Sequence, residues 1–270
     1  MKVISFNANG LRARIHQIKA IIDKHEPDII GIQEIKVCNE QFPVKKIKEL
    51  GYDVIFHGQK GHYGVALLYR LPLIDSHKGF PHDNDESQKR LITGVFRFND
   101  KKITVLNGYF PQGESRSHTL KYPYKRQFYS DLAEHLDRKY DPTDLLLVIG
   151  DMNIAPIDLD IGIAEESKKR WLRTGKCCFL PEEREWLQKI EKWGLIDSYQ
   201  HFYPKETNRL SWYDYRSRGF EMNPKRGLRI DLILASKPVI EITADTGIDH
   251  AIRGMEKPSD HCPVWITLDS

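Results

Sequence analysis

The sequence predicts an α/β fold in which two mixed β-sheets pack face to face and helices cover their outer faces. Three observations predict it. Strand-like and helix-like segments recur in both halves of the 270 residues, several strand-like segments are separated only by short polar turns, and no linker or low-complexity tract divides the chain. Short turns favour antiparallel neighbours, and mixed helices and strands favour layered packing. We therefore expect residues 1–270 to form a single domain, a four-layer α/β (α+β) sandwich.

Each element is expected from a local pattern, taken in chain order. The first strand is the apolar run 3–6, and apolar residues then recur at helical spacing from Leu11 to Ile22, which predicts an amphipathic helix that ends before Pro27. Further strands are expected at 29–33, 53–57, 65–69, 91–98, 102–109, 145–149, 210–212, 228–234 and 263–268. Helices are expected at 125–139 and 181–193, the second with a proline in its first turn and acidic residues beside it.

The composition is that of an ordinary globular protein. Hydrophobic residues make up 40% and charged residues 29% of the chain, which argues against disorder. The start of the chain turns polar too soon for a secretory signal, and no apolar run approaches membrane-spanning length, so we expect a cytoplasmic protein with no membrane partner. The 41 Lys and Arg residues nearly balance the 38 Asp and Glu residues, so attraction to nucleic acid would have to come from local clusters of charge.

Polar side chains follow several apolar strands at the points where those strands end. They are Asn7 after 3–6, Glu34 after 29–32, Tyr109 after 103–106, and Asp151 and Asn153 after 145–149. Such residues add nothing to sheet packing, whereas a divalent cation and a phosphate need oxygen ligands and hydrogen-bond donors that converge on one point. Taken singly, most could be Asx turns or helix caps, and Glu34 could pair with Lys36. Together they predict metal-dependent phosphate-transfer chemistry.

Asp231 is the most informative single residue. It lies between Ile230 and Leu232 in an expected strand, where a buried carboxylate without a partner would be costly. Strand alternation points Arg229 to the opposite face, which favours His261 as the partner. A carboxylate that holds an imidazole in one tautomer is a catalytic device, although an Asp–His pair can also be purely structural.

Basic residues are interleaved with aromatic residues in four segments. These segments are 57–64, 88–90, 121–126 and 168–173. Lys and Arg side chains neutralise phosphates, and aromatic rings stack on bases or sugars, so the pattern is typical of nucleic-acid binding. A run of charge is also compatible with an ordinary solvated face.

Six segments in order along the chain match a known family. They are 6–14 (FNANGLRAR), 33–36 (QEIK), 61–66 (GHYGVA), 108–114 (GYFPQGE), 150–156 (GDMNIAP) and 259–261 (SDH). Over nearly its whole length the chain resembles the exonuclease III class of apurinic/apyrimidinic (AP) DNA repair nucleases. The resemblance implies the DNase I-like fold, also called the endonuclease/exonuclease/phosphatase fold. Two departures are the small Ala8 between two Asn residues and a loop at 221–226 that looks about two residues longer than usual.

The resemblance implies roles for residues at the strand ends and near the C-terminus. Glu34 would be the main Mg²⁺ ligand, and the other residues in or beside the metal shell would be Asn7, Asp151, Asn153 and Asp260. The residues implied in catalysis are Tyr109, Asp151, Asn153, Asp231, Asp260 and His261. Tyr109, Asn153 and His261 would hold the scissile phosphate, Asp151 would orient and deprotonate the attacking water, and Asp231 would orient His261. The residues alone leave the number of metal ions open, and they leave the general base open among Asp151, a Tyr109 phenolate and His261.

The resemblance also implies a DNA-binding surface and a set of activities. Trp212, Leu228 and Ile230 would form an apolar pocket for a baseless deoxyribose, and Arg90, Gln112 and Lys121 would contact DNA. The implied enzyme is a Mg²⁺-dependent DNA phosphodiester hydrolase, with Mn²⁺ as a substitute. It would be a 3'-to-5' exonuclease on duplex DNA, an AP endonuclease and a 3'-end-cleaning phosphatase or phosphodiesterase. Its partners would be double-stranded DNA, abasic-site DNA and 3'-blocked ends, and it would act as a monomer.

Two other functions compete with this interpretation. The same fold and metal constellation also serve phosphoesterases that act on lipid or inositol phosphates. The basic and aromatic clusters, together with the missing membrane anchor, count against that alternative. A catalytically silent DNA-binding protein would be expected to lack Glu34, Asp151 or His261, and the chain has all three.

Overall fold

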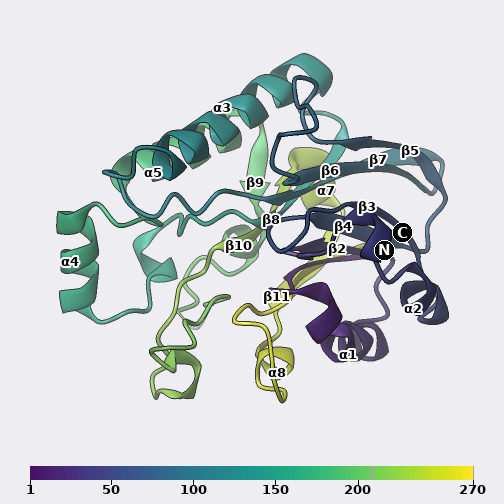
Figure 1. Ribbon diagram of the computed structural model, residues 1–270. Coiled ribbons are helices and arrows are strands. Elements are labelled where there is room, and N and C mark those ends of the chain that lie inside the picture. The colour runs from purple at the N-terminus through teal and green to yellow at the C-terminus, as the bar shows by residue number, and fades with distance from the viewer. Residues whose placement is uncertain (208, 270) are drawn as a thin grey trace.

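Two six-stranded sheets pack against each other at the centre of the molecule (Figure 1). The computed structural model describes residues 1–207 and 209–269. One sheet has the strand order β11-β12-β1-β2-β4-β3 and the other the order β5-β6-β7-β8-β10-β9. Each contains one parallel pair, β1 with β2 and β7 with β8, among antiparallel neighbours. The predicted fold class, two mixed sheets with flanking helices, is therefore confirmed.

The strands are short and differ in burial. The first sheet consists of β1 (Lys2–Asn7), β2 (Ile29–Gln33), β3 (Asp53–His57), β4 (Val65–Tyr69), β11 (Thr243–Ile248) and β12 (Val264–Leu268). The second consists of β5 (Leu73–Lys78), β6 (Leu91–Phe98), β7 (Lys101–Tyr109), β8 (Leu145–Asp151), β9 (Leu195–Asp197) and β10 (Asp231–Ser236). The central strands are buried on both faces, as expected for sheets covered by helices.

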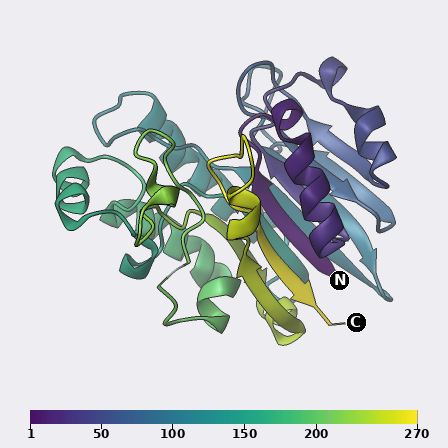
Figure 2. The same ribbon diagram turned by 90° about the horizontal axis from the view of Figure 1, so that it is seen from below.

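Helices cover both outer faces. They are α1 (Ile15–His25), α2 (Val44–Glu49), α3 (Lys121–Lys139), α4 (Glu165–Thr174), α5 (Pro181–Trp193), α6 (Ser198–Phe202), α7 (Lys237–Glu241) and α8 (His250–Arg253). Short 3-10 helices occur at η1 (Leu11–Ala13), η2 (Asn39–Gln41), η3 (Asp158–Asp160) and η4 (Gly219–Glu221). The long helices α3 and α5 lie over the second sheet, whereas α1 lies across the first (Figures 1 and 2). Among the described residues, no helix is long and apolar enough to cross a membrane.

Alternation of side chains along the strands divides the apolar core into layers. In β1, Val3 belongs to the cluster between the two sheets, whereas Ile4 and Phe6 pack under α1. In β8, Ile149 faces the other sheet and Val148 packs under α3 and α5. Successive side chains of a strand point to opposite faces, so strands that are buried on both faces have continuous apolar runs such as 145–149 of β8.

Several segments differ from the sequence-based expectation. The expected strand 228–234 begins only at Asp231 as β10, and 210–212 forms isolated bridges through Trp212 to Leu228 and His261 instead of a strand. Helix α3 begins at Lys121, four residues earlier than expected. The expected elements did not include β5, β9 or β11. Strand β5 lies at a sheet edge, is mostly exposed and carries a bulge, so it lacks the apolar pattern on which such an expectation depends.

Strand register brings the polar strand ends to one edge of the sandwich. Asn7 is paired with Gln33, the residue before Glu34. Tyr109 is paired with Asp151, and Asp151 is paired in turn with Asp231. The parallel pairs β1–β2 and β7–β8 thus end near one another, and the candidate catalytic residues meet at that edge.

Candidate active site

A cavity of about 540 Å³ opens at this edge of the sandwich. Ten residues that the sequence predicted line it: Glu34, Tyr109, Gln112, Asp151, Asn153, Trp212, Leu228, Ile230, Asp260 and His261. Asn7 and Asp231 lie directly behind the wall, where both are buried. Five further lining residues were not assigned to the site from the sequence, namely Glu114, Trp171, Lys176, Cys178 and Arg216.

Two carboxylates and an imidazole converge at the floor of the cavity. Ligand atoms of Glu34, Asp151 and His261 all lie within 4.8 Å of one another. The Asn7 amide nitrogen lies between the carboxylates and donates to Glu34 Oε1 at 3.0 Å and to Asp151 Oδ2 at 2.9 Å. Asp151 is buried and Glu34 is only partly exposed, so two carboxylates this close repel each other, and an oxygen-binding divalent cation fits this donor set. Asn7 acts here as a donor, and its Oδ1 accepts the Asn9 backbone N–H at 2.9 Å.

The predicted Asp231–His261 pair is present. His261 Nδ1 lies 2.9 Å from Asp231 Oδ2, and the Ser211 hydroxyl donates to the same oxygen at 2.7 Å. With Nδ1 held in this way, His261 Nε2 faces the cavity and lies 3.8 Å from Asp151 Oδ2. Arg229 points away, as strand alternation predicted, and is buried in ion pairs with Asp160 and Asp197.

The charges in the cavity shift one another's protonation equilibria. Burial lowers the pKa of His261, but the carboxylates of Asp231, Asp151 and Asp260 outweigh it and raise the pKa to about 10. Burial raises the pKa of Asp151, and the neighbouring Asp231 and Glu34 add to that shift. The three carboxylates therefore favour the protonated imidazole, which suits it to bind a phosphate oxygen.

Tyr109 is the third candidate base left open by the sequence. Burial raises the pKa of its phenol well above the usual range, and the carboxylates of Glu34 and Asp151 push it further in the same direction. The neutral phenol is a hydrogen-bond donor. Its surroundings therefore favour a role for Tyr109 in binding the phosphate.

Asp260 links the apolar wall of the cavity to the carboxylates. Trp212 Nε1 donates to Asp260 Oδ2 at 2.9 Å, and Asn9 Nδ2 donates to Asp260 Oδ1 at 2.8 Å. Lys36 contacts both Asn9 Oδ1 at 2.5 Å and Glu34 Oε2 at 2.8 Å. Although burial raises the pKa of Asp260, His261 and these hydrogen bonds hold it below its usual value. The sequence suggested the Glu34–Lys36 contact, whereas Asn9, although it lies in the matched segment 6–14, was given no role in the site.

Asn153 is held in an uncommon backbone conformation at the end of β8. Its φ is 51°, in the left-handed region, and its backbone N–H donates to Asp151 Oδ1 at 3.0 Å. Its side-chain Nδ2 donates to the Phe110 carbonyl at 2.9 Å. Left-handed non-glycine residues are uncommon and persist only where the surroundings hold them.

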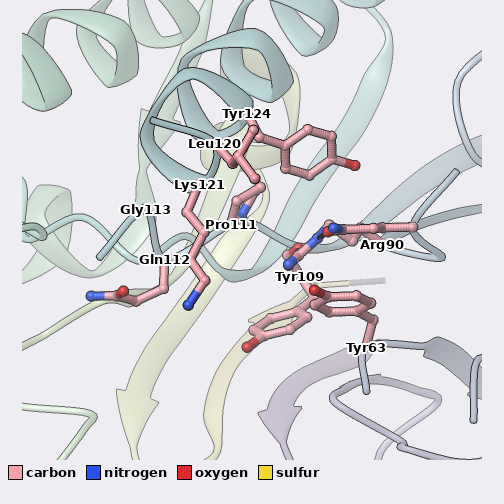
Figure 3. A pocket seen from close by; sticks show the side chains of 10 residues that line it. Tyr63, Arg90, Tyr109, Pro111, Gln112, Gly113, Leu120, Lys121 and Tyr124 are labelled. Atoms are coloured by element: carbon pink, nitrogen blue, oxygen red, sulfur yellow. Dashed lines mark hydrogen bonds between the residues drawn. The ribbon is translucent and has the colours of Figure 1, made fainter. Parts of the chain in front are cut away.

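Arg90 and Lys121 line a second cavity of about 420 Å³, which shares Tyr109 and Gln112 with the first (Figure 3). The Arg90 guanidinium lies 4.1 Å from the Tyr63 ring centroid and 4.7 Å from that of Tyr109. Arg90 is buried, and its Nη1 donates to the Tyr109 carbonyl at 2.9 Å. Lys121 is exposed at the rim, where its ammonium pairs with Glu114 at 2.6 Å.

The longer loop expected at 221–226 lies beside the apolar wall. Met222 and Arg226 line a third cavity of about 250 Å³. It shares four lining residues with the main cavity, namely Trp171, Lys176, Trp212 and Arg216. The position of this loop therefore agrees with the expectation that it adjoins the pocket.

One member of the basic clusters was misread. The segment 121–126 was interpreted either as typical of nucleic-acid binding or as an ordinary solvated face, but Lys125 is fully buried and paired with Glu183. The sequence contains no signal for this contact, because the two residues belong to different helices that meet only in the folded chain.

The comparisons with known proteins agree with this geometry. The chain belongs to the Endonuclease/Exonuclease/phosphatase family, whose profile matches residues 4–261. It is 55% identical over 265 residues to exodeoxyribonuclease III of Haemophilus influenzae, covering 98% of each chain. The predicted resemblance to the exonuclease III class, and with it the prediction of an enzyme of this nuclease class, is confirmed.

Solved structures of related proteins match the chain over its whole length. An AP endonuclease from Archaeoglobus fulgidus superposes with a TM-score of 0.90 at 32% identity, covering 100% of both chains. A 3' phosphatase from Neisseria, bound to a product DNA hairpin, superposes with a TM-score of 0.89, also at 32% identity and over 100% of both chains. The fold of the chain is thus that of DNA repair nucleases.

Proposed function

We propose that this protein is a Mg²⁺-dependent DNA phosphodiester hydrolase that incises abasic sites, removes nucleotides from 3' ends of duplex DNA and clears blocked 3' ends. One observation carries the proposal. The carboxylates of Glu34 and Asp151 and the imidazole of His261 converge at one end of a cavity that Trp212 and Leu228 wall with apolar surface. The relatives described above supply the substrate class.

The donor set supports a hard divalent cation. Glu34 is the main proposed ligand, with Asp151, Asn153 and Asp260 in or beside the shell, and the carboxylates have the oxygen chemistry that Mg²⁺ prefers. Asn7 supports the shell by holding Glu34 and Asp151 through its amide nitrogen. When bound, the cation stabilises the negative charge that develops on the phosphate oxygens and on the leaving oxygen. Mn²⁺ has similar ligand preferences and is the proposed substitute.

The residues of the chain supply the remaining parts of the reaction. Asp151 accepts a proton from a water whose oxygen attacks phosphorus, and the bond from phosphorus to the 3' oxygen breaks. The leaving 3' oxygen takes up a proton from solvent water, so the products carry a 3' hydroxyl and a 5' phosphate. His261, oriented by Asp231, donates a hydrogen bond from Nε2 to the phosphate. Tyr109 and Asn153 bind the remaining phosphate oxygens. Catalysis is then mostly positioning and electrostatic stabilisation.

The apolar wall provides the selection for abasic sites. Trp212, Leu228 and Ile230 line the side of the cavity and are at most partly exposed. A deoxyribose without its base fits a closed apolar recess that an intact nucleotide does not enter. Arg90, Gln112 and Lys121 line the adjoining cavity (Figure 3). In this proposal, they hold the flanking DNA strand.

The proposal also covers domain organisation, oligomeric state and location. We propose that residues 1–270 act as one domain and as a monomer, in the cytoplasm and on nucleoid DNA. Hydrolysis of lipid or inositol phosphates is the alternative within the family, but the relatives reported above are nucleases and a DNA 3' phosphatase.

A cleavage assay on two duplexes tests the proposal. The purified protein is incubated with Mg²⁺ and either a duplex with one abasic site or an undamaged blunt duplex, and products are resolved by length and end group. We expect one cut at the abasic site with a 3' hydroxyl, and stepwise shortening of the blunt duplex from its 3' ends. Failure to cleave either duplex in Mg²⁺ or Mn²⁺, with release of phosphate from an inositol phosphate, would establish the alternative.

The metal assignment has its own test. Glu34→Ala should leave the fold intact but lower the rate by about 10³-fold, because a lost ligand removes several kcal/mol of charge stabilisation and about 1.4 kcal/mol corresponds to a tenfold rate. Chelation should have the same effect and be reversed by Mg²⁺. Glu241→Ala, an exposed residue of α7, is the control and should behave as the unmodified protein. Near-normal turnover of Glu34→Ala in limiting Mg²⁺ would contradict the assignment.

A further inference from the structure

Lys125 is a charged residue in the core that the proposed reaction does not use. It lies in the first half of α3 and has 0% of its surface exposed. Lysine is almost never fully buried unless it is paired. Its partner is Glu183 of α5, also fully buried, with Nζ 2.5 Å from Oε1.

The ammonium of Lys125 has three protons and three acceptors. Besides Glu183, it donates to the carbonyl of Asn153 at 2.8 Å and to the carbonyl of Gln112 at 3.3 Å. Gln112 follows β7 and Asn153 follows β8, so one side chain joins the two loops that carry candidate site residues. All donor capacity of the ammonium is thereby used.

Glu183 anchors the other end of the pair. Its second carboxylate oxygen accepts the backbone N–H of Leu180 at 2.9 Å, at the start of α5. The carboxylate therefore fixes the helix end as well as the ammonium. A displacement of Lys125 would be resisted from both α3 and α5.

A neighbouring residue of α3 reinforces this arrangement. Tyr129, one turn after Lys125, donates its hydroxyl to the Met152 carbonyl at 2.7 Å. Met152 and Asn153 thus have both backbone carbonyls held by α3, and Asn153 is the residue in the left-handed conformation. A backbone in that region persists only where its surroundings restrain it. We call Lys125, Glu183 and Tyr129 the loop clamp, because together they hold the backbone after β8.

We propose that the loop clamp is a positioning device for the active site, in which the Lys125–Glu183 ion pair holds the loops after β7 and β8 so that Asp151, Asn153 and Gln112 meet the phosphate in the productive arrangement. The inference rests on the proposed function. None of the three clamp residues lines the main cavity, so they act through other residues.

Stability alone is a poor explanation for the pair. Replacement of a buried ion pair by apolar residues of similar size is often neutral or stabilising, because both charges lose their hydration on folding. An apolar pair, however, could not donate to the carbonyls of Gln112 and Asn153. What the ammonium adds is a fixed position for two loops, and a misplacement of about 1 Å in such a site can lower a rate about 100-fold.

The main test removes the charges and keeps the volume and the helix cap. In the double variant Lys125→Met with Glu183→Gln, the glutamine oxygen can still accept the Leu180 N–H. We expect kcat on the abasic duplex to fall about 30-fold at a temperature well below Tm, with Tm changed by only a few degrees. Hydrogen exchange should accelerate at residues 113–115 and 152–155 and stay unchanged in β1 and β2.

A matched pair of hydroxyl deletions covers the case in which the double variant fails to fold. Tyr129→Phe removes a hydroxyl that holds the Met152 carbonyl, and Tyr52→Phe removes one that holds the Pro27 carbonyl, far from the site. Both lose a buried tyrosine-to-carbonyl hydrogen bond. Tyr129→Phe should lower kcat about fivefold and accelerate exchange at 152–155, with little change in KM, whereas Tyr52→Phe should leave kcat unchanged.

The outcomes separate this inference from the proposed function. If the unmodified protein cleaves neither duplex, the proposed function is wrong. The loop clamp can still be tested by hydrogen exchange in that case, because this measurement does not require an active enzyme. The clamp is overturned if exchange at 152–155 is unchanged in the variants, or if Tyr52→Phe and Tyr129→Phe lower kcat equally in an active enzyme.

Discussion

The imidazole of His261 is oriented by its hydrogen bond to Asp231, and three neighbouring carboxylates raise its pKa. Asp231 holds Nδ1, which leaves Nε2 to face the cavity. The carboxylates of Asp231, Asp151 and Asp260 raise the pKa of the imidazole and favour its protonated form. The side chain is thus fixed as a hydrogen-bond donor toward the place where a phosphate would lie.

Asp231 and His261 should therefore act as one unit. Asp231→Asn and His261→Asn should each lower the rate by about a thousandfold, and the double variant by little more, because either change leaves the other residue without its function. A double-mutant cycle on the abasic duplex measures this. Losses that simply multiply would show that the two residues act independently and that the pair is structural.

Trp212 combines two contacts in one side chain. Its ring faces the cavity, and its N–H donates to Asp260. Trp212→Ala should depress abasic-site cleavage more than cleavage at a normal 3' end, because the apolar recess is lost. Trp212→Phe keeps a ring but removes the donor, so it should restore much of the preference for abasic sites.

Measurement of kcat/KM on both substrates decides the role of Trp212. Equal losses on the two substrates in Trp212→Ala would mean that the ring is a general stacking surface or only part of the core. Ile74→Ala, an exposed apolar residue of β5, is the control and should leave the ratio of the two activities unchanged.

At the scale of elements, the site residues at the ends of strands were predictable from the sequence, whereas contacts between helices were not. Asn7, Glu34, Tyr109 and Asp151 each end an apolar strand, and parallel register brings those ends together. That inference needs only the period and the length of the strands. The edge strands β5 and β11 have mixed polar sequences, and only pairing in the folded chain makes them strands.

Contacts between distant helices were not predictable. Lys125 lies in the segment 121–126, whose basic and aromatic residues were interpreted as typical of nucleic-acid binding. The structure instead buries Lys125 against Glu183 of α5. A cluster of basic residues in the sequence does not show which member a helix turns inward.

Glu191 of α5 should make the stability of the folded chain depend on pH. Burial raises the pKa of Glu191 from 4.5 to about 7, and the nearby Asp197 adds to the shift, while Arg229 opposes it. Because the folded pKa lies above the unfolded pKa, the folded chain holds the extra proton between these values. The stability contribution is complete below pH 4.5 and is lost as the pH rises through 7.

Glu191→Gln removes this titration. At pH 8 the variant should have a Tm about 3 °C above that of the unmodified protein, because a gain of about 1 kcal/mol shifts Tm by about 2–4 °C in a chain of this size. At pH 4 the two proteins should unfold at nearly the same temperature. Thermal unfolding followed by circular dichroism at both pH values checks this, and an equal difference at pH 4 and pH 8 would contradict the assignment.

At the scale of the whole molecule, net charge is a poor guide to DNA binding. The chain carries only +3, yet the cavity system that runs from Arg90 past Tyr109 to Arg216 combines basic side chains with aromatic rings. Binding should therefore depend on a local path of positive charge. Duplex affinity should fall linearly with salt on a log-log scale, with a slope of roughly −0.9 for each phosphate contact.

Lys121 is the best position at which to test that path. Its ammonium is exposed at the rim of the cavity in Figure 3 and pairs with Glu114, so a phosphate must compete with that carboxylate. Lys121→Ala should weaken binding at low salt and reduce the magnitude of the salt slope by about one unit, because one phosphate contact is lost.

Glu114→Gln should instead strengthen binding at low salt, since it frees the Lys121 ammonium for DNA. Fluorescence anisotropy of a labelled duplex between 50 and 200 mM salt, about the range in which such contacts are lost, measures both. An unchanged slope in Lys121→Ala would remove Lys121 from the DNA path, and weaker binding by Glu114→Gln would mean that the carboxylate itself supports the complex.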